Sequence, residues 1–265
     1  MKIDSFLILL LILPLALISI PASAQGQHNI YPLSAKLQAK LHGHYDDVRP
    51  YVLHLKNGPN LVCPSMNIAQ VDDKFDDIDT LISGLSLSPE CIWKTISNNA
   101  KRLAKNLAAI HGFAFGAVLE ASMAVGAQFG PELVIMPFDD THLLVGMVRF
   151  QGGDLSIGLS GAGFTQAVIH GECANSIWSY LGWFKSFSSL AITRSIGVNF
   201  PLIDENRSYC DALASTRGMN SSVIGISYTH YEQLGKFLLV SGPRTRSMID
   251  FIKKLNTSDN TSLKQ

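Results

Sequence analysis

Residues 113 to 129 read FAFGAVLEASMAVGAQF, and their side chains alternate in size with a period of two. Every odd position from Phe113 to Phe129 is apolar, whereas the even positions, Val118 excepted, are small or polar. Successive side chains of a strand point to opposite faces, so the pattern predicts a strand with one bulky face and one nearly bare face. A bare face permits strong curvature, or a second layer pressed close to the backbone.

The period of two continues to about residue 240. Asp139-Asp140 and Gln151–Asp154 predict hairpin turns, and a further turn is predicted from Glu232 to Gly235. The predicted strands cover residues 113–129, 132–138, 141–150, 154–169, 182–200 with a break, and 222–240.

Helical periodicity is confined to the first 112 residues and to the C-terminal part of the chain. Residues 33–42, LSAKLQAKLH, predict a short amphipathic helix, and Ser247 to Leu255 predict another. Ser88 and Pro89 are typical of a helix start, and Gly112 is the predicted end of the helix that follows them. Its basic residues lie mostly away from its apolar stripe, which indicates a surface helix packed on a core or, as the alternative, one lying on a membrane.

These patterns predict an α+β fold, in which a helical N-terminal part precedes a strongly curved antiparallel sheet, barrel-like or folded as a tight sandwich. The predicted parts are a signal peptide at 1–24, a helical and irregular part at 25–112, a Gly-rich antiparallel β domain at 113–243, and a C-terminal helix with a disordered tail at 244–265.

The first residues have the features of a secretory signal peptide. Lys2 precedes an apolar run from Phe6 to Ile20, and Ala22-Ser23-Ala24 fits the small-residue rule for cleavage. The run is short for a membrane span, so we expect cleavage after Ala24 and no transmembrane span in the mature chain. The protein is therefore predicted to be secreted or periplasmic.

The chain contains four cysteines, an even number in a chain predicted to reach an oxidising compartment. This favours two disulfides, and three connectivities are possible. Pairing within each half of the chain is preferred, because each disulfide would then cross-link one half internally. That pairing joins Cys63 to Cys91 and Cys173 to Cys210.

Composition argues against nucleic acid as a partner, because 21 Lys and Arg balance 21 Asp and Glu, and phosphate binding requires a basic excess. Charged residues make up only 16% of the chain, so the surface must be rich in uncharged polar groups or be covered by something.

Motifs that could support catalysis or metal binding are incomplete. His42, His44 and Asp46 resemble part of a binuclear metal motif that ends in His, but Asp47 stands in that last position. His170-Gly171-Glu172-Cys173 lacks the downstream cysteine pair of zinc deaminases. No metal site and no cofactor are therefore predicted.

Gly158-Leu159-Ser160-Gly161-Ala162 differs from a nucleophile elbow in its last residue. It leaves open a secreted hydrolase that uses Ser160, or a histidine-centred site, with His142, His170 or His230 as the base.

The sequence thus favours an exported, disulfide-stabilised, non-enzymatic protein of the cell envelope that binds an apolar small molecule, a lipid surface or another exported protein. The alternatives are the secreted hydrolase and a toxin or effector that inserts the 154–169 hairpin into a membrane. The residues predicted to border the apolar site are Phe113, Phe115, Trp178, Trp183 and Phe184.

Overall fold

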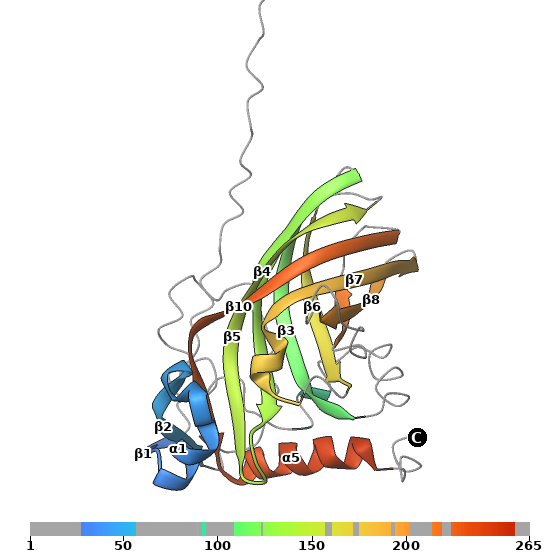
Figure 1. Ribbon diagram of the computed structural model, residues 1–265. Helices are drawn as coiled ribbons and strands as arrows, with labels where there is room; N and C mark the ends of the chain where they lie inside the picture. The colour runs from blue at the N-terminus through green and yellow to red at the C-terminus, as the bar shows by residue number, and fades with distance from the viewer. Residues whose placement is uncertain are drawn as a thin grey trace, which may run out of the picture.

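The structure is a computed structural model that describes residues 28–56, 89, 92–93, 109–122, 124–156, 161–171, 175–191, 194–201, 214–218 and 224–257 (Figure 1). The strands are β1 (His28–Pro32), β2 (Val48–Leu55), β3 (Ile110–Ser122), β4 (Ala124–Pro137), β5 (His142–Ser156), β6 (Gly161–His170), β7 (Gly182–Ala191), β8 (Arg194–Pro201), β9 (Ala214–Gly218) and β10 (Ile224–Ser241). The helices with described bounds are α1 (Ala35–Leu41) and α5 (Pro243–Asn256), and η2 (His42–Asp47) and η5 (Ile177–Tyr180) are 3-10 turns.

Hydrogen bonding joins the ten strands in the order β1-β2-β10-β5-β4-β3-β6-β9-β8-β7. Neighbouring strands are antiparallel, except that β2 and β10 run parallel. One edge of β10 pairs with β5. Its other edge is divided between β7, which pairs with residues 224–231, and β2, which pairs with residues 237–241. Among the described strands β1 pairs with β2 alone, so its outer edge is free.

The predicted fold class is wrong. The part predicted as helical contains two strands, β1 and β2, on either side of the seven-residue helix α1. The sheet is mixed, not antiparallel, because β2 and β10 run parallel, and it is not strongly curled as was predicted. The reason lies in β2, which buries Val52 in one hydrophobic cluster and Leu53 in another and therefore gains burial on both faces by pairing with β10.

The strand predicted at 113–129 is two strands, β3 and β4, which form an antiparallel pair. Ser122 pairs with Gly126, so the chain reverses within a few residues. The alternation of large and small side chains passes through the reversal unchanged, and the segment contains no Asn-Gly, Asp-Gly or Gly-Gly pair and no Pro to signal a hairpin. Periodicity alone therefore could not locate this turn.

Two of the predicted turns are absent. Residues 151–154 belong to β5, and residues 232–235 belong to β10. Gly235 has a φ of +67°, and the register between β10 and β5 is irregular from Leu234 to Leu238, so this glycine marks a bulge in a continuous strand. The turn predicted at Asp139-Asp140 is confirmed, because β4 ends at Pro137 and β5 begins at His142.

The short helix predicted at 33–42 is confirmed as α1, and the C-terminal helix is confirmed as α5. The helix predicted to end at Gly112 is wrong at that end, because β3 begins at Ile110. A Cβ added at Gly112 would overlap the carbonyl oxygen of Ile135, so this glycine permits β3 and β4 to pack closely. The rest of that helix lies mostly outside the described residues, as do the signal peptide and the C-terminal tail.

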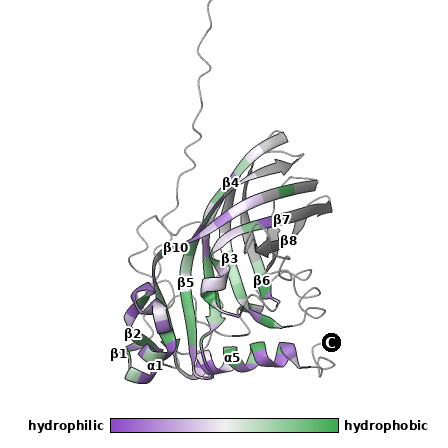
Figure 2. Ribbon diagram, in the orientation of Figure 1, coloured by the Kyte–Doolittle hydropathy of each residue, from purple (hydrophilic) through white to green (hydrophobic). Residues whose placement is uncertain are grey.

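One face of the sheet is covered by α5, which lies across its lower end in Figure 1. Pro243 begins the helix, and Met248, Ile249, Ile252 and Leu255 are its buried apolar stripe. Figure 2 shows hydrophobic and hydrophilic segments alternating along α5, as expected for a helix buried on one side. The Asn256 side chain accepts from the Ile110 N–H at 2.6 Å and donates to the Ile110 carbonyl at 2.7 Å, which fixes the end of α5 to β3.

The opposite face of this end is covered by α1 and η5. Leu37 and Leu41 of α1 and Tyr180 of η5 belong to one hydrophobic cluster with Phe237 of β10. Gly146 of β5 shows why small residues are needed here, because a Cβ at this position would overlap the Phe237 ring. An aromatic side chain therefore lies directly against the backbone that the bare face exposes.

We call the part of the sheet covered by α5 and α1 the covered end, and the part toward the β3–β4 reversal the far end. At the covered end the sheet is buried on both faces. The far end carries the candidate site.

Candidate functional site

The candidate site is one face of the far end, formed by β4, β5, β10 and β7. The strand register aligns Phe129 with Gln151, Gln151 with His230, and His230 with Trp183. Residues aligned in this way lie on the same face of a sheet. This first row therefore crosses four strands.

The next rows follow at two-residue intervals. The second row aligns Ala127, Gly153, Tyr228 and Lys185. The third includes Ile226 of β10. Three strand spacings separate β4 from β7, which is about 14 Å at the usual spacing of strands.

Four large apolar side chains on these rows are exposed: Phe129 by 50%, Trp183 by 54%, Tyr228 by 45% and Ile226 by 37%. We call these four residues the aromatic face. Isolated exposed apolar residues are common, but several on one continuous surface mark an interaction site.

Polar and charged groups lie between and beside the residues of the aromatic face, and Gln151 and His230 separate Phe129 from Trp183. The ring centres of His230 and Trp183 are 4.9 Å apart, and Nζ of Lys185 lies 5.7 Å from the centre of the Tyr228 ring. In the next row toward the covered end, Arg149 forms an ion pair with Glu232. The arrangement suits contact with an apolar surface that carries polar or anionic groups at its boundary.

The five residues predicted to border an apolar site are not brought together. Trp183 alone belongs to the aromatic face. Phe113 and Phe115 are buried in the cluster that packs against α5, whereas Phe184 is buried in the cluster on the opposite face. Trp178 packs at the margin of that second cluster and stacks on His44, with ring centres 4.1 Å apart.

Phe129, Ile226 and Tyr228 were missed from the sequence. Each lies in a predicted strand, and each was one apolar residue among many with the same period. The decisive information is the register, which places them beside one another on the part of the face that α5 does not reach. The strand pairing could not be read from the sequence.

The histidines considered as catalytic bases lie far apart in the sheet. His142 contacts Asp139, with Nδ1 and Oδ1 separated by 2.9 Å, at the turn between β4 and β5. His230 borders the aromatic face, and His170 is buried at the end of β6. Ser160 and the four cysteines lie outside the described residues, so the nucleophile and the disulfides remain predictions.

The histidine-rich segment 42–47 forms η2, in which His44 Nδ1 lies 2.8 Å from Asp47 Oδ2. Within the part of the chain that the structure describes, no group of three or more His, Cys, Asp or Glu side chains is placed to hold a metal ion. None of the described helices is both long enough and apolar enough to cross a membrane.

Comparison with models of known protein families, with curated proteins and with solved structures finds no match to this chain. Function is therefore inferred from the geometry of the far end.

Proposed function

We propose that this protein is exported and binds a lipid surface through the aromatic face. The observation that carries the proposal is the alignment of Phe129, Trp183, Ile226 and Tyr228 on one exposed face of four paired strands. Trp and Tyr favour the boundary between water and lipid, because an apolar ring there meets the acyl chains while its polar group stays hydrated.

The free energy available from this contact is moderate. Fully burying a large apolar side chain contributes about 1.5–3 kcal/mol, and these four side chains are about half exposed. Transferring their exposed parts into lipid would therefore contribute about 3–6 kcal/mol in total. That value suits reversible attachment and is far from the permanent anchoring of a transmembrane helix.

The extent and the charges of the face favour a lipid surface over a small apolar ligand. A small ligand is usually enclosed in a concave pocket. The aromatic face instead extends along adjacent strands, with its members on β4, β7 and β10. Lys185 beside Tyr228 offers a cation at the border, which suits the anionic headgroups of a membrane.

Vesicle flotation tests the proposal directly. The mature chain, residues 25–265, is mixed with vesicles of phosphatidylcholine and phosphatidylglycerol, and the floating fraction is measured. We expect the wild-type protein to float and the double variant Ile226→Ser/Tyr228→Ser to lose most of its binding.

The matched control is Ile30→Ser/Tyr31→Ser. Ile30 is 55% exposed and Tyr31 is 48% exposed, but both lie on the edge strand β1, away from the aromatic face. Equal flotation by the two double variants would contradict the proposal, as would a wild-type protein that stays at the bottom of the gradient.

A further inference from the structure

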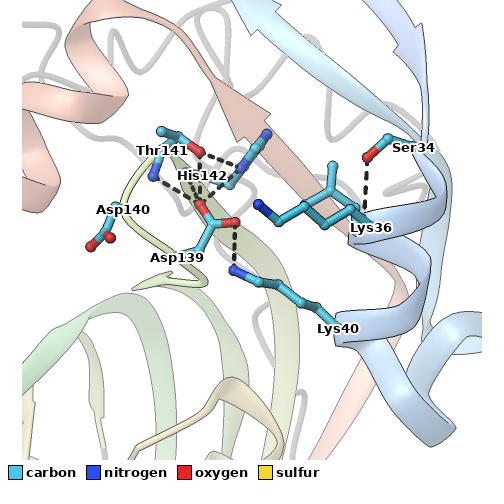
Figure 3. Close-up of a pocket in the computed structure, with 8 residues that line it drawn as sticks. Ser34, Lys36, Lys40, Asp139, Asp140, Thr141 and His142 are labelled. Carbon is cyan, nitrogen blue, oxygen red and sulfur yellow. Dashed lines mark hydrogen bonds and ion pairs between the residues drawn. The ribbon is translucent and has the colours of Figure 1, made fainter.

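A cleft of about 400 Å³ lies at the covered end, between α1 and the turn that joins β4 to β5 (Figure 3). Ser34, Lys36 and Lys40 line it from the α1 side, and the turn lines it with Asp139, Asp140, Thr141 and His142. Figure 3 shows the side chains of Lys36 and Lys40 extending from α1 toward the Asp139 carboxylate. The cleft is distinct from the aromatic face, because these residues lie at the opposite end of β4 and β5.

The carboxylate of Asp139 is fully engaged by its own turn and by Lys40. Oδ1 accepts hydrogen bonds from the Thr141 N–H at 2.8 Å, the Thr141 hydroxyl at 2.9 Å and the His142 N–H at 2.9 Å, and it lies 2.9 Å from His142 Nδ1. Oδ2 accepts from Lys40 Nζ at 3.3 Å. Partial burial acts to raise the pKa of Asp139, but the hydrogen bonds from His142 and Thr141 outweigh it and hold that pKa well below its usual range.

His142 is oriented by the same turn. Its Nδ1 lies 2.9 Å from both Asp139 Oδ1 and the Thr141 hydroxyl. Among the described residues no hydrogen bond to its Nε2 is found, so this atom can meet a polar group of a ligand in the cleft.

Two lysines and two aspartates line the cleft, and the two lysines differ in their partners. Lys36 and Lys40 are four residues apart and lie on one side of α1, an arrangement of like charges that destabilises a helix unless an anion lies between them. Asp139 is the carboxylate that contacts Lys40, whereas Asp140 points its charge toward α5 and contacts Lys253 Nζ at 2.7 Å. Among the described residues Lys36 therefore forms no ion pair, so its ammonium group can meet an anion in the cleft.

We propose that this cleft binds an oxyanion, a phosphate or a carboxylate, that is carried by a small molecule or by a lipid headgroup. The ammonium group of Lys36 supplies the main charge contact, with Lys40 beside it. His142 Nε2 forms a hydrogen bond to a second polar group of the ligand. Lysine binds phosphate as a point charge, and the cleft volume is within the usual range for small-molecule sites.

The test is an NMR titration of the ¹⁵N-labelled mature chain with phenyl phosphate and, separately, with benzoate, at constant ionic strength. We expect saturable shifts of the Lys36, Lys40, Thr141 and His142 amides. Lys36→Met should weaken binding about tenfold, because the charged partner is lost while the apolar stem is kept. Lys36→Arg should retain most of the binding.

Lys236→Met is the matched control, because Lys236 is an exposed lysine of β10 outside the cleft. Binding that falls equally in both methionine variants, or shifts that sodium chloride reproduces, would overturn the proposal. Shifts caused only by vesicles containing phosphatidylglycerol would assign the oxyanion to a lipid headgroup. The absence of shifts with every probe would also overturn the proposal.

The aromatic-face variant Ile226→Ser/Tyr228→Ser should bind phenyl phosphate normally, which separates this proposal from the lipid-surface proposal.

Discussion

The covered end and the far end of the sheet are built from the same strands, yet apolar side chains are buried at the first and exposed at the second. On β4, Leu133 and Ile135 are buried in the hydrophobic cluster that includes α5, whereas Phe129 is half exposed on the same face. On β10, Leu238 and Val240 are buried under the helix, and Ile226 and Tyr228 are exposed. The exposure of these apolar side chains therefore depends on where the cover of α5 ends, and not on the residue types of the strands.

The boundary between the two ends is marked by the ion pair of Arg149 and Glu232. Polar residues at this row separate the core from the aromatic face. An exposed apolar face is a liability for a protein in water, because it favours association with other apolar surfaces. Its presence beyond a well-covered core is consistent with a surface for binding.

The largest predicted difference between the two ends concerns phenylalanine. Phe237→Ala should reduce the free energy of unfolding by about 3–5 kcal/mol, because the ring is fully buried and its removal leaves a cavity. Phe129→Ala should change it by no more than about 0.5 kcal/mol, because half of that side chain is exposed. Urea unfolding measures the free energy of unfolding of both variants. An equal decrease in the two would contradict the difference between the two ends.

The next difference concerns two glycines of β5, Gly146 at the covered end and Gly153 at the far end. Gly146→Ala should cost about 1–3 kcal/mol, because the new methyl group would overlap the Phe237 ring. Gly153→Ala at the far end should be neutral or stabilising by up to about 1 kcal/mol, because the nearest atom to its added Cβ is 3.8 Å away. Thermal unfolding measures both variants. If Gly146→Ala were the more stable of the two, the close approach of Phe237 to the backbone would be wrong.

A smaller difference is expected for tyrosine. The buried Tyr180 hydroxyl donates to Glu132 Oε2 at 2.6 Å, so Tyr180→Phe should cost about 1–2 kcal/mol by leaving the carboxylate with one donor fewer. Tyr228→Phe should leave stability unchanged, because Tyr228 is 45% exposed. Chemical unfolding at pH 7 compares the two variants, and a cost at Tyr228 equal to that at Tyr180 would contradict the assignment of the two ends.

The same hydroxyl predicts a pH dependence. Burial, followed by the negative charge of Glu132, raises the pKa of Tyr180 well above its usual value. The folded protein therefore holds this proton more tightly than the unfolded chain, and the resulting stability is complete below about pH 10 and is lost as the pH rises further. Tyr180→Phe should show a smaller loss of stability between pH 9 and pH 11 than the wild-type protein.

Several features of the fold follow from local sequence patterns. The period of two predicts most of the sheet residues, Asp139-Asp140 predicts a turn, and the apolar stripe after Pro243 predicts α5. In each case the signal lies within a few residues and reflects the geometry of one element. The β3–β4 reversal has no such signal, because the alternation of large and small residues continues through it.

The features that were missed depend on contacts between distant residues. The parallel pairing of β2 with β10 joins segments about 185 residues apart, and no local pattern encodes it. Phe113 and Phe115 were predicted at the site because they are large and apolar, but the same property places them in the core. The aromatic face and the cleft are both products of register and of helix position, so neither could be assigned from residue types alone.

The most direct test of the account is the quenching of tryptophan fluorescence by brominated lipids. In one protein Trp93 and Trp178 are replaced by Phe so that Trp183 remains, and in a second protein Trp178 alone remains. We predict strong quenching and a blue shift for Trp183 when vesicles bind, and little change for Trp178, which is stacked on His44 away from the aromatic face. Vesicle binding without quenching of Trp183, or with equal quenching of Trp178, would contradict the claim that the far end is the lipid-binding surface.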